Sequence, residues 1–135
     1  MITKKKVTHL SYEIMNAAIE VHNTLGPGLL ESVYEKCLKH ELISRGNYVT
    51  SQVGVPIDYK GIKLDAELRI DLLVDDLVIV EVKATENLHP AYEAQVLTYM
   101  RLHKKPQGLV INFFSRKLKE SYIPLVNEYF RQLPD

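Results

Sequence analysis

Two short runs, IDLLV at residues 70–74 and LVIVEVK at residues 77–83, restrict the fold of this chain more than any other feature. Both runs are almost continuously apolar and rich in aliphatic residues, which is typical of strands covered on both faces. Only Asp75 and Asp76 separate them, so the two strands are expected to pair as a hairpin. The sequence therefore predicts a buried sheet that contains this hairpin.

Three segments with a helical period flank the hairpin. Apolar residues recur every three or four positions from Leu10 to Leu25, from Leu30 to about Arg45 and from Pro90 to about Lys104. Gly26 predicts the end of the first helix, because glycine commonly follows the last helical residue. The chain is therefore expected to begin with two helices and to place a third between its later strands.

The remaining segments favour strands and turns. Strands are expected over residues 49–59, 62–68 and 108–114, with a turn at Lys60-Gly61 between the first two. Asn112 is unusual inside a buried strand and is expected to form local hydrogen bonds. For residues 117–132 we expect a last helix that Pro124 interrupts. These elements predict one α/β (α+β) domain over residues 1–135, with a mixed central sheet flanked by helices.

The composition restricts the class of protein. A chain of 135 residues with 46% hydrophobic and 25% charged residues is typical of one soluble domain with its own core. No apolar run approaches the roughly 20 residues that cross a membrane. The single cysteine, Cys37, excludes an intramolecular disulfide and favours the reducing cytoplasm. A net charge of zero gives no bulk basic signature of nucleic-acid binding.

Three charged side chains interrupt the two apolar runs. Glu81 and Lys83 share one face of their strand, and taken alone they are typical of a solvent-exposed strand end. Asp71 lies in the neighbouring run, where a carboxylate needs a partner because burying an isolated charge is costly. The two acids are therefore expected to approach each other across the hairpin.

The length of the hairpin loop decides whether Asp71 and Glu81 share a face. A two-residue loop at Asp75-Asp76 would pair Asp71 with Val80 and leave Glu81 on the opposite face. A three-residue loop such as Val74–Asp76, with Asp76 left-handed, would place both carboxylates on one face. A site that contains both carboxylates therefore requires a loop with an odd number of residues.

Two carboxylates side by side repel each other unless a cation or a proton lies between them. Carboxylate oxygens suit Mg²⁺ or Mn²⁺, which commonly bind one or two carboxylates together with water and substrate phosphate. A bound ion acidifies water and stabilises charge on a phosphodiester, and Lys83 could position that water or neutralise the charge. Asp71, Glu81 and Lys83 are therefore the parts expected of a metal-dependent phosphodiesterase.

Several residues on the helices are candidates for the same site. Glu31 and Tyr34 can face one neighbour on the second helix, although helix-dipole electrostatics explains an acid in the first turn equally well. Gln95 and Tyr99 lie four residues apart on the third helix, where Gln95 either bonds a carboxylate or phosphate or forms an amphipathic edge. His22 on the first helix is more often a structural histidine than a ligand.

These residues resemble a known pattern. Asp71 followed by Glu81-Val82-Lys83 is similar to the D…(D/E)-x-K core of the PD-(D/E)xK nuclease superfamily, with Ile70 in place of the proline. The stretch VHNTLGPGLLESVYE resembles the signature of the GxxExxY family within that superfamily, with Gly28, Glu31 and Tyr34 at its named positions. The resemblance continues through QVLTYM and GLVINFF and covers roughly residues 10–130.

The resemblance implies a restriction-endonuclease-like fold with a Mg²⁺ or Mn²⁺ site. Asp71, Glu81 and the Val82 carbonyl would be the metal ligands, and Lys83 would serve the attacking water. Glu31 would be an acid that the helix adds to the site. The remaining candidates would support the site or the substrate: Gln95, Tyr99, Tyr34 and His22.

The implied activity is hydrolysis of nucleic acid, DNA more than RNA. The alternative is a module that retains the fold and binds nucleic acid or a protein without turnover, which the neutral charge favours slightly. A homodimer is a further expectation, because a second copy would supply the missing basic surface. The candidate residues for that surface are Lys104, Lys105, Arg116, Lys117 and Lys119.

Overall fold

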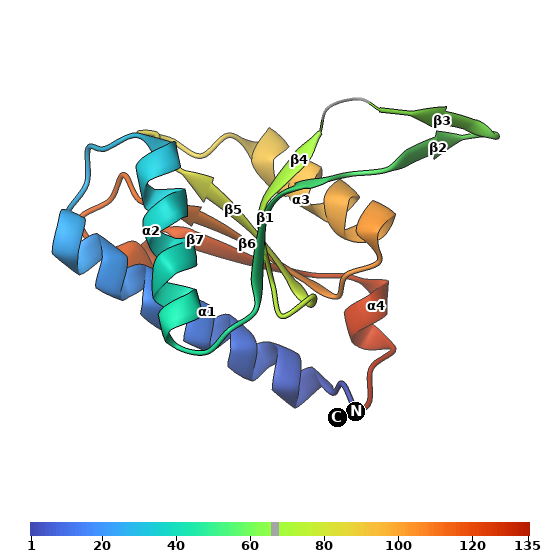
Figure 1. Cartoon of the computed structure of the whole chain (residues 1–135), viewed down its shortest axis with the longest axis horizontal. Helices are drawn as coiled ribbons and strands as arrows, with labels where there is room; N and C mark the ends of the chain where they lie inside the picture. The colour runs from blue at the N-terminus through green and yellow to red at the C-terminus, as the bar shows by residue number, and fades with distance from the viewer. Residues whose placement is uncertain (66–67) are drawn as a thin grey trace.

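A computed structural model describes residues 1–65 and 68–135 (Figure 1). Its elements in chain order are α1 (Lys4–Leu25), α2 (Glu31–Ser44), β1 (Val49–Gly54), β2 (Ile57–Tyr59), β3 (Ile62–Leu64), β4 (Arg69–Val74), β5 (Val78–Lys83), α3 (Pro90–His103), β6 (Gln107–Asn112), the 3₁₀ turn η1 (Leu118–Glu120), β7 (Tyr122–Val126) and α4 (Glu128–Arg131).

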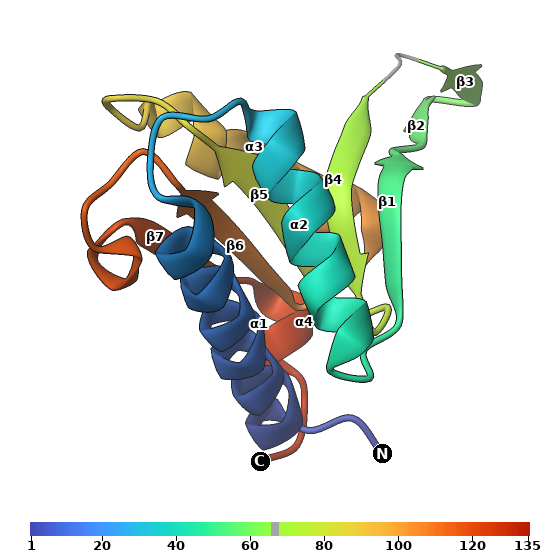
Figure 2. The ribbon, with the colours of Figure 1, turned by 60° about the vertical axis from the view of Figure 1, so that its left-hand side comes forward.

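The central sheet has five strands in the order β1-β4-β5-β6-β7. Strands β5 and β6 are parallel and α3 connects them, whereas the other neighbouring pairs are antiparallel. Helices α1 and α2 cover one face and α3 covers the other (Figure 2). The predicted fold class is confirmed: a mixed sheet lies between helices in a restriction-endonuclease-like arrangement.

The sheet faces explain the two buried runs of the sequence. Strands β4 and β5 are internal, so their aliphatic side chains pack against α1 and α2 on one side and against α3 on the other. The approach of α3 to the sheet is close at Gly108, where an added Cβ would lie 2.6 Å from Val96. A side chain at Gly108 would therefore displace α3 from β6.

The three predicted helices are confirmed. Helix α1 begins at Lys4, earlier than Leu10, because the Thr3 hydroxyl caps it by accepting the Lys6 N–H at 3.1 Å. It ends at Gly26, whose φ of 74° is a left-handed value. Within the described ranges, no helix is long and apolar enough to cross a membrane.

The prediction of one continuous strand over residues 49–59 is wrong. It is interrupted at Val55-Pro56, and the two halves belong to different sheets. Strands β2 and β3 form a separate two-stranded arm that projects from the body (Figure 1). The predicted turn at Lys60-Gly61 is confirmed, with φ values of 48° and 88°. Of the expected continuation over 62–68, residues 66–67 lie outside the described part.

The predicted helix over residues 117–132 is also wrong. Most of this segment is η1 and β7, and only Glu128–Arg131 is helical. Pro124 lies within β7, which is an edge strand, so its missing N–H removes no bond between strands. Strand β6 ends at Asn112 instead of Phe114.

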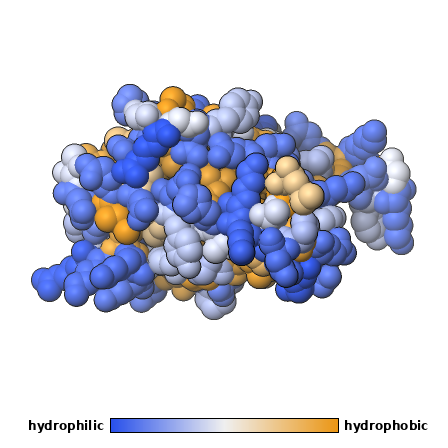
Figure 3. Space-filling model, turned by 90° about the horizontal axis from the view of Figure 1, so that it is seen from below, coloured by the Kyte–Doolittle hydropathy of each residue, from blue (hydrophilic) through white to orange (hydrophobic). Residues whose placement is uncertain are grey.

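On the face shown in Figure 3, hydrophobic side chains are confined to patches between hydrophilic ones.

Candidate functional site

The register of the β4–β5 hairpin brings Asp71 opposite Glu81. Leu72 pairs with Val80 and Val74 with Val78, so the loop is the three residues 75–77. The loop has an odd number of residues, as predicted, but it begins one residue later than expected. Asp75 and Asp76 are both left-handed, with φ values of 51° and 58°. The same register, continued by one residue, places Asp71 across from Glu81.

The strand pairing gives way to side-chain hydrogen bonds at these two acids. The Asp71 N–H donates to Glu81 Oε1 at 3.2 Å, and the Val82 N–H donates to Asp71 Oδ2 at 2.8 Å. Each acid therefore accepts from the neighbouring strand, where a regular ladder would use backbone carbonyls. This exchange holds the two carboxylates together at the end of the paired region.

The electrostatics of the pair favour a proton or a cation. Glu81 is only 4% exposed. Its burial, followed by the negative charge of Asp71, raises the pKa of Glu81 from 4.5 to about 8. Burial and then the charges of Glu81 and Asp71 also raise the pKa of the Tyr99 hydroxyl. Tyr99 therefore lies close to both acids and remains a neutral hydrogen-bond donor.

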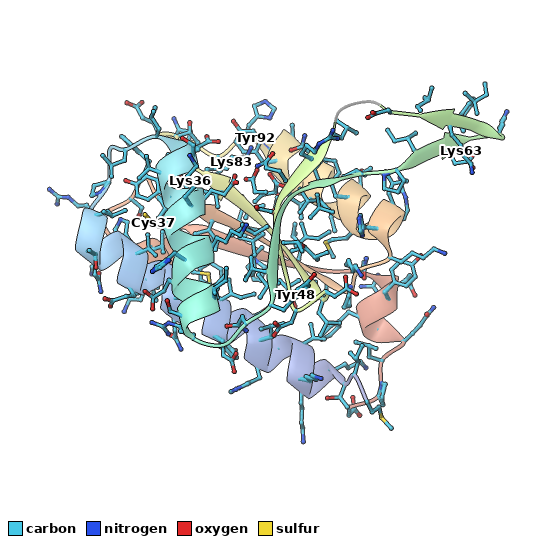
Figure 4. The ribbon with its side chains drawn as sticks, viewed as in Figure 1. Lys36, Cys37, Tyr48, Lys63, Lys83 and Tyr92 are labelled. Atoms are coloured by element: carbon cyan, nitrogen blue, oxygen red, sulfur yellow. The ribbon has the colours of Figure 1, made fainter. Side chains whose placement is uncertain are left out.

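Lys83 lies on the same face of β5 as Glu81. Burial and the charge of Asp71 raise the pKa of Glu81, and the positive charge of Lys83 opposes that rise. The Lys83 Nζ is 4.4 Å from the centroid of the Tyr92 ring, where β5 ends and α3 begins (Figure 4). The structure thus brings Asp71, Glu81, Lys83 and Tyr99 together.

Glu31 lies at the edge of this group. It is an exposed residue in the first turn of α2, and its Oε2 accepts the Ala84 N–H at 3.4 Å. Because Ala84 follows Lys83, Glu31 is next to the end of β5. Its position combines the two interpretations that the sequence left open, a first-turn acid and a neighbour of the site.

Glu35 and Gln52 form a contact that sequence reasoning missed. The Gln52 Nε2 lies 3.0 Å from each carboxylate oxygen of Glu35. Burial raises the pKa of Glu35, the bond from Gln52 opposes that rise, and the charge of Asp71 with a hydrogen bond to it adds to the rise. Glu35, one turn after Glu31, is therefore the α2 acid that neighbours Asp71. Its spacing from Glu31 was the only signal in the sequence.

An unusual backbone conformation in β1 makes this contact. Neighbouring residues of a strand normally point to opposite faces. Ser51 and Gln52 nevertheless both reach α2, since Ser51 Oγ accepts from Lys39 Nζ at 2.8 Å while Gln52 binds Glu35. Gln52 has a φ of 53°, which inverts the alternation at this residue. No sequence pattern indicates a left-handed glutamine inside a strand.

A profile of the PD-(D/E)XK nuclease superfamily matches residues 8–123. The match spans most of the chain and includes both acids and Lys83. The chain belongs to the PD-(D/E)XK nuclease superfamily. The match is to the superfamily as a whole, so the narrower GxxExxY assignment remains a prediction. No curated protein and no solved structure matches the chain at a significant level.

Members of the PD-(D/E)XK superfamily generally use divalent metal ions. The side-chain oxygens of Asp71 and Glu81 are hard ligands of the kind that Mg²⁺ and Mn²⁺ prefer. Within residues 1–65 and 68–135, no three His, Cys, Asp or Glu side chains are grouped closely enough to hold a metal ion. The chain therefore fits a site of two carboxylates completed by backbone and water oxygens.

Tyr34 packs in the core and contacts neither carboxylate through a hydrogen bond in the described residues. It is fully buried and its ring stacks on Phe113, with centroids 4.5 Å apart. Its hydroxyl donates to the Gly26 carbonyl at 2.5 Å and accepts the Leu29 N–H at 3.1 Å. Tyr34 therefore fixes the loop that leads into Glu31.

Among the described residues, no hydrogen bond joins His22 or Gln95 to Asp71 or Glu81. The His22 Nε2 is 2.6 Å from the Ser115 carbonyl, so it anchors the loop after β6. Gln95 is exposed, one turn before Tyr99. Its side chain forms no hydrogen bond in the part of the chain that the structure describes. This position matches the amphipathic edge that the sequence left open for Gln95.

Asn112 forms one local hydrogen bond, as predicted, since its Oδ1 accepts the Phe114 N–H at 3.1 Å. Its other bonds join distant parts of the chain. Its Oδ1 accepts the Thr85 N–H at 3.2 Å, and its Nδ2 donates to the Thr85 carbonyl at 2.9 Å. Thr85 follows β5 by two residues, so Asn112 ties the segment after Lys83 to the end of β6. This bond limits the movement of the strand end that carries Lys83.

Proposed function

We propose that this protein is a Mg²⁺- or Mn²⁺-dependent nuclease. The observation that carries the proposal is the bonding of the Asp71 N–H to Glu81 Oε1 and of the Val82 N–H to Asp71 Oδ2 at the end of the β4–β5 pairing, with Lys83 two residues beyond Glu81. Membership of the PD-(D/E)XK superfamily supports phosphodiester hydrolysis as the reaction. We expect one domain over residues 1–135, in the cytoplasm.

The acids would hold the metal ion. Asp71, Glu81 and the Val82 carbonyl are the proposed ligands, and Glu35, which neighbours Asp71, would orient that acid. When bound, the ion would acidify a water and stabilise negative charge on the phosphodiester. Glu31, beside Ala84, is proposed to act at the border of the site with the substrate.

The other residues would position and stabilise charge. The Lys83 ammonium, which rests on the Tyr92 ring, is proposed to face the attacking water or the phosphate oxygens. The Tyr99 hydroxyl would donate to the carboxylates and fix their orientation. Gln95, exposed one turn away on α3, is available to a substrate strand. Tyr34 and His22 would support the loops around the site.

The proposed substrate is nucleic acid, DNA more than RNA. A binding module without turnover is the second candidate, and the net charge of zero favours it, because a nuclease that binds duplex DNA is usually more basic. The two candidates differ in their need for metal. A nuclease requires the ion for turnover, whereas a module binds its partner without it.

The test uses purified protein with Mg²⁺ or Mn²⁺ on single- and double-stranded DNA and RNA. We expect metal-dependent cleavage that falls by at least about 100-fold in Asp71→Asn and in Lys83→Met. Both substitutions nearly preserve side-chain size, so we expect both variants to fold. Thermal melts check that they do. Intact substrates under all conditions, or unchanged cleavage by Asp71→Asn, would contradict the proposal.

A further inference from the structure

The segment that follows β6 concentrates positive charge on a chain of zero net charge. Arg116, Lys117 and Lys119 occupy three of four consecutive positions and are all exposed. Among the residues that the structure describes, none of these three forms an ion pair. Their charges are therefore available to an external anion.

The three cations surround a hollow beside the C-terminal part of α1. The hollow has a volume of about 260 Å³, and no acidic side chain lines it. Its other lining residues are Ile19, His22, Asn23 and Leu118. A recess with basic walls and no acid favours a negatively charged occupant.

The backbone of this segment is fixed although its cations are exposed. The His22 Nε2 donates to the Ser115 carbonyl at 2.6 Å. Ser115 Oγ accepts the Lys117 N–H at 3.2 Å and donates to the Lys117 carbonyl at 3.0 Å. Leu118 is buried in the core. A binding partner would therefore meet charges on an ordered frame, which lowers the entropy lost on binding.

The basic segment leaves the sheet at the same edge as the candidate site. Strands β5 and β6 are parallel, with Lys83 opposite Asn112, and the Phe113 N–H donates to the Lys83 carbonyl at 2.8 Å. Figure 2 shows the end of β5 and the loop after β6 at one edge of the sheet. One extended ligand can therefore reach both regions.

Without a bound cation, the acids of the site oppose the approach of a polyanion. Asp71, Glu81 and Glu35 are acids, and Lys83 is engaged with the Tyr92 ring. In the absence of metal, affinity for a phosphate backbone must therefore come mainly from another surface. Phe114, which is 42% exposed at the start of the basic segment, adds an aromatic face on which a base can stack.

We propose that residues 114–119 form the surface on which this protein holds a single strand of nucleic acid next to the site. Arg116, Lys117 and Lys119 bind backbone phosphates, and Phe114 stacks on a base. The proposal rests on the nuclease function proposed above. It also gives this chain its own basic surface, without a second copy.

The test measures binding without cleavage, by fluorescence anisotropy of a labelled single-stranded DNA in EDTA over a series of salt concentrations. The triple variant Arg116→Gln/Lys117→Gln/Lys119→Gln is compared with Lys4→Gln/Lys5→Gln/Lys6→Gln. The control removes the same charge at the opposite end of α1. Thermal melts show whether both variants remain folded.

We expect the loop variant to bind at least about tenfold more weakly and to reduce the slope of log K against log salt by about 2. The control variant should change both quantities much less. Phe114→Ala should weaken binding about fivefold or more without changing the slope. Equal weakening by the two triple variants, or wild-type binding by the loop variant, overturns the proposal.

Further outcomes distinguish failure of the binding-surface proposal from failure of the proposed nuclease function. Displacement of the DNA by polyglutamate at the same charge concentration would show an acidic-peptide surface and overturn the nucleic-acid assignment. Binding that maps to residues 114–119 while no condition supports cleavage would overturn the nuclease proposal alone. Cleavage that persists unchanged in the loop variant overturns only the role of this surface.

Discussion

The side-chain amide of Gln52 lies 3.0 Å from both carboxylate oxygens of Glu35, joining β1 to α2 beside Asp71. The contact depends on the φ of 53° at Gln52, which turns this side chain toward α2. A left-handed residue other than glycine costs on the order of 1–2 kcal/mol, and such conformations cluster at functional sites. The pair is therefore a candidate for positioning the acids.

Replacing Gln52 with glycine separates folding from function. Glycine adopts a φ of 53° without strain, so Gln52→Gly should leave the free energy of unfolding unchanged or raise it by about 1 kcal/mol. Mn²⁺ affinity and cleavage should fall about tenfold, because Glu35 loses the amide that orients it. Urea denaturation and calorimetric Mn²⁺ titration measure the two effects.

Ser51→Gly is the matched control for that substitution. It places glycine at the neighbouring strand position, where φ is not left-handed, and should destabilise the protein by roughly 0.5–1 kcal/mol. If Gln52→Gly destabilised the protein as much as Ser51→Gly, or bound Mn²⁺ like the wild type, the positioning role would be contradicted.

Glu31 and Glu35 of α2 should differ in their effect on metal binding. Glu35 neighbours Asp71, whereas the bond of Glu31 to the Ala84 N–H is 3.4 Å long and exposed. We expect Glu35→Gln to weaken Mn²⁺ binding about tenfold more than Glu31→Gln in calorimetry. A larger effect of Glu31→Gln would assign the third acid to Glu31, as the sequence resemblance implies.

Exchanging the members of the Gln52–Glu35 pair tests whether the position of the carboxylate matters. The double variant Glu35→Gln/Gln52→Glu keeps an amide and a carboxylate in contact but moves the charge to β1. We expect it to keep a thermal stability close to that of the wild type, because the contact persists, while its Mn²⁺ affinity is as low as that of Glu35→Gln. Wild-type values of both properties would show a structural role only.

The raised pKa of Glu81 predicts how metal-free stability depends on pH. The folded pKa of about 8 exceeds the ordinary value of 4.5, so the folded state favours the protonated acid. The stability from this preference is complete below pH 4.5 and is lost as pH rises to 8. Asp71, Lys83 and Tyr99 are the charged or titratable groups near Glu81.

Glu81→Gln removes this dependence because the amide does not titrate. In EDTA, the free energy of unfolding of this variant relative to wild type should be higher at pH 8 than at pH 5, by on the order of a few kcal/mol. Urea denaturation at the two pH values checks it. An equal difference at both pH values would mean that Glu81 ionises normally in the folded protein.

Tyr34 and Tyr99 should respond differently to loss of the hydroxyl. Tyr34→Phe removes the link between Gly26 and Leu29 and should lower the free energy of unfolding by about 1–3 kcal/mol. Tyr99→Phe should reduce cleavage by about tenfold with little effect on stability. The reverse pattern in thermal melts and cleavage rates would exchange the two roles.

Much of the fold and part of the site follow from local pattern. Continuous apolar runs predict β4 and β5, and the need for Asp71 and Glu81 to share a face predicts the odd loop. The local bond of Asn112 to the Phe114 N–H is predictable, because a buried amide needs partners. These inferences depend on residue type and spacing within a few positions.

The rest depends on tertiary structure. Pro124 suggested an interrupted helix, yet a proline is equally compatible with an edge strand, and only the strand order makes β7 an edge. The choice between Glu31 and Glu35 depends on how α2 is rotated about its axis relative to the sheet. The left-handed Gln52 results from contact with that helix, so no local pattern indicates it.

The most direct measurement for the central claim is a crystal structure of the protein soaked in Mn²⁺, with anomalous diffraction data. We expect an anomalous peak between the carboxylates of Asp71 and Glu81, within bonding distance of both, and no peak there in Asp71→Asn. A wild-type crystal with no peak at these acids, or with its strongest peak elsewhere, would contradict the account.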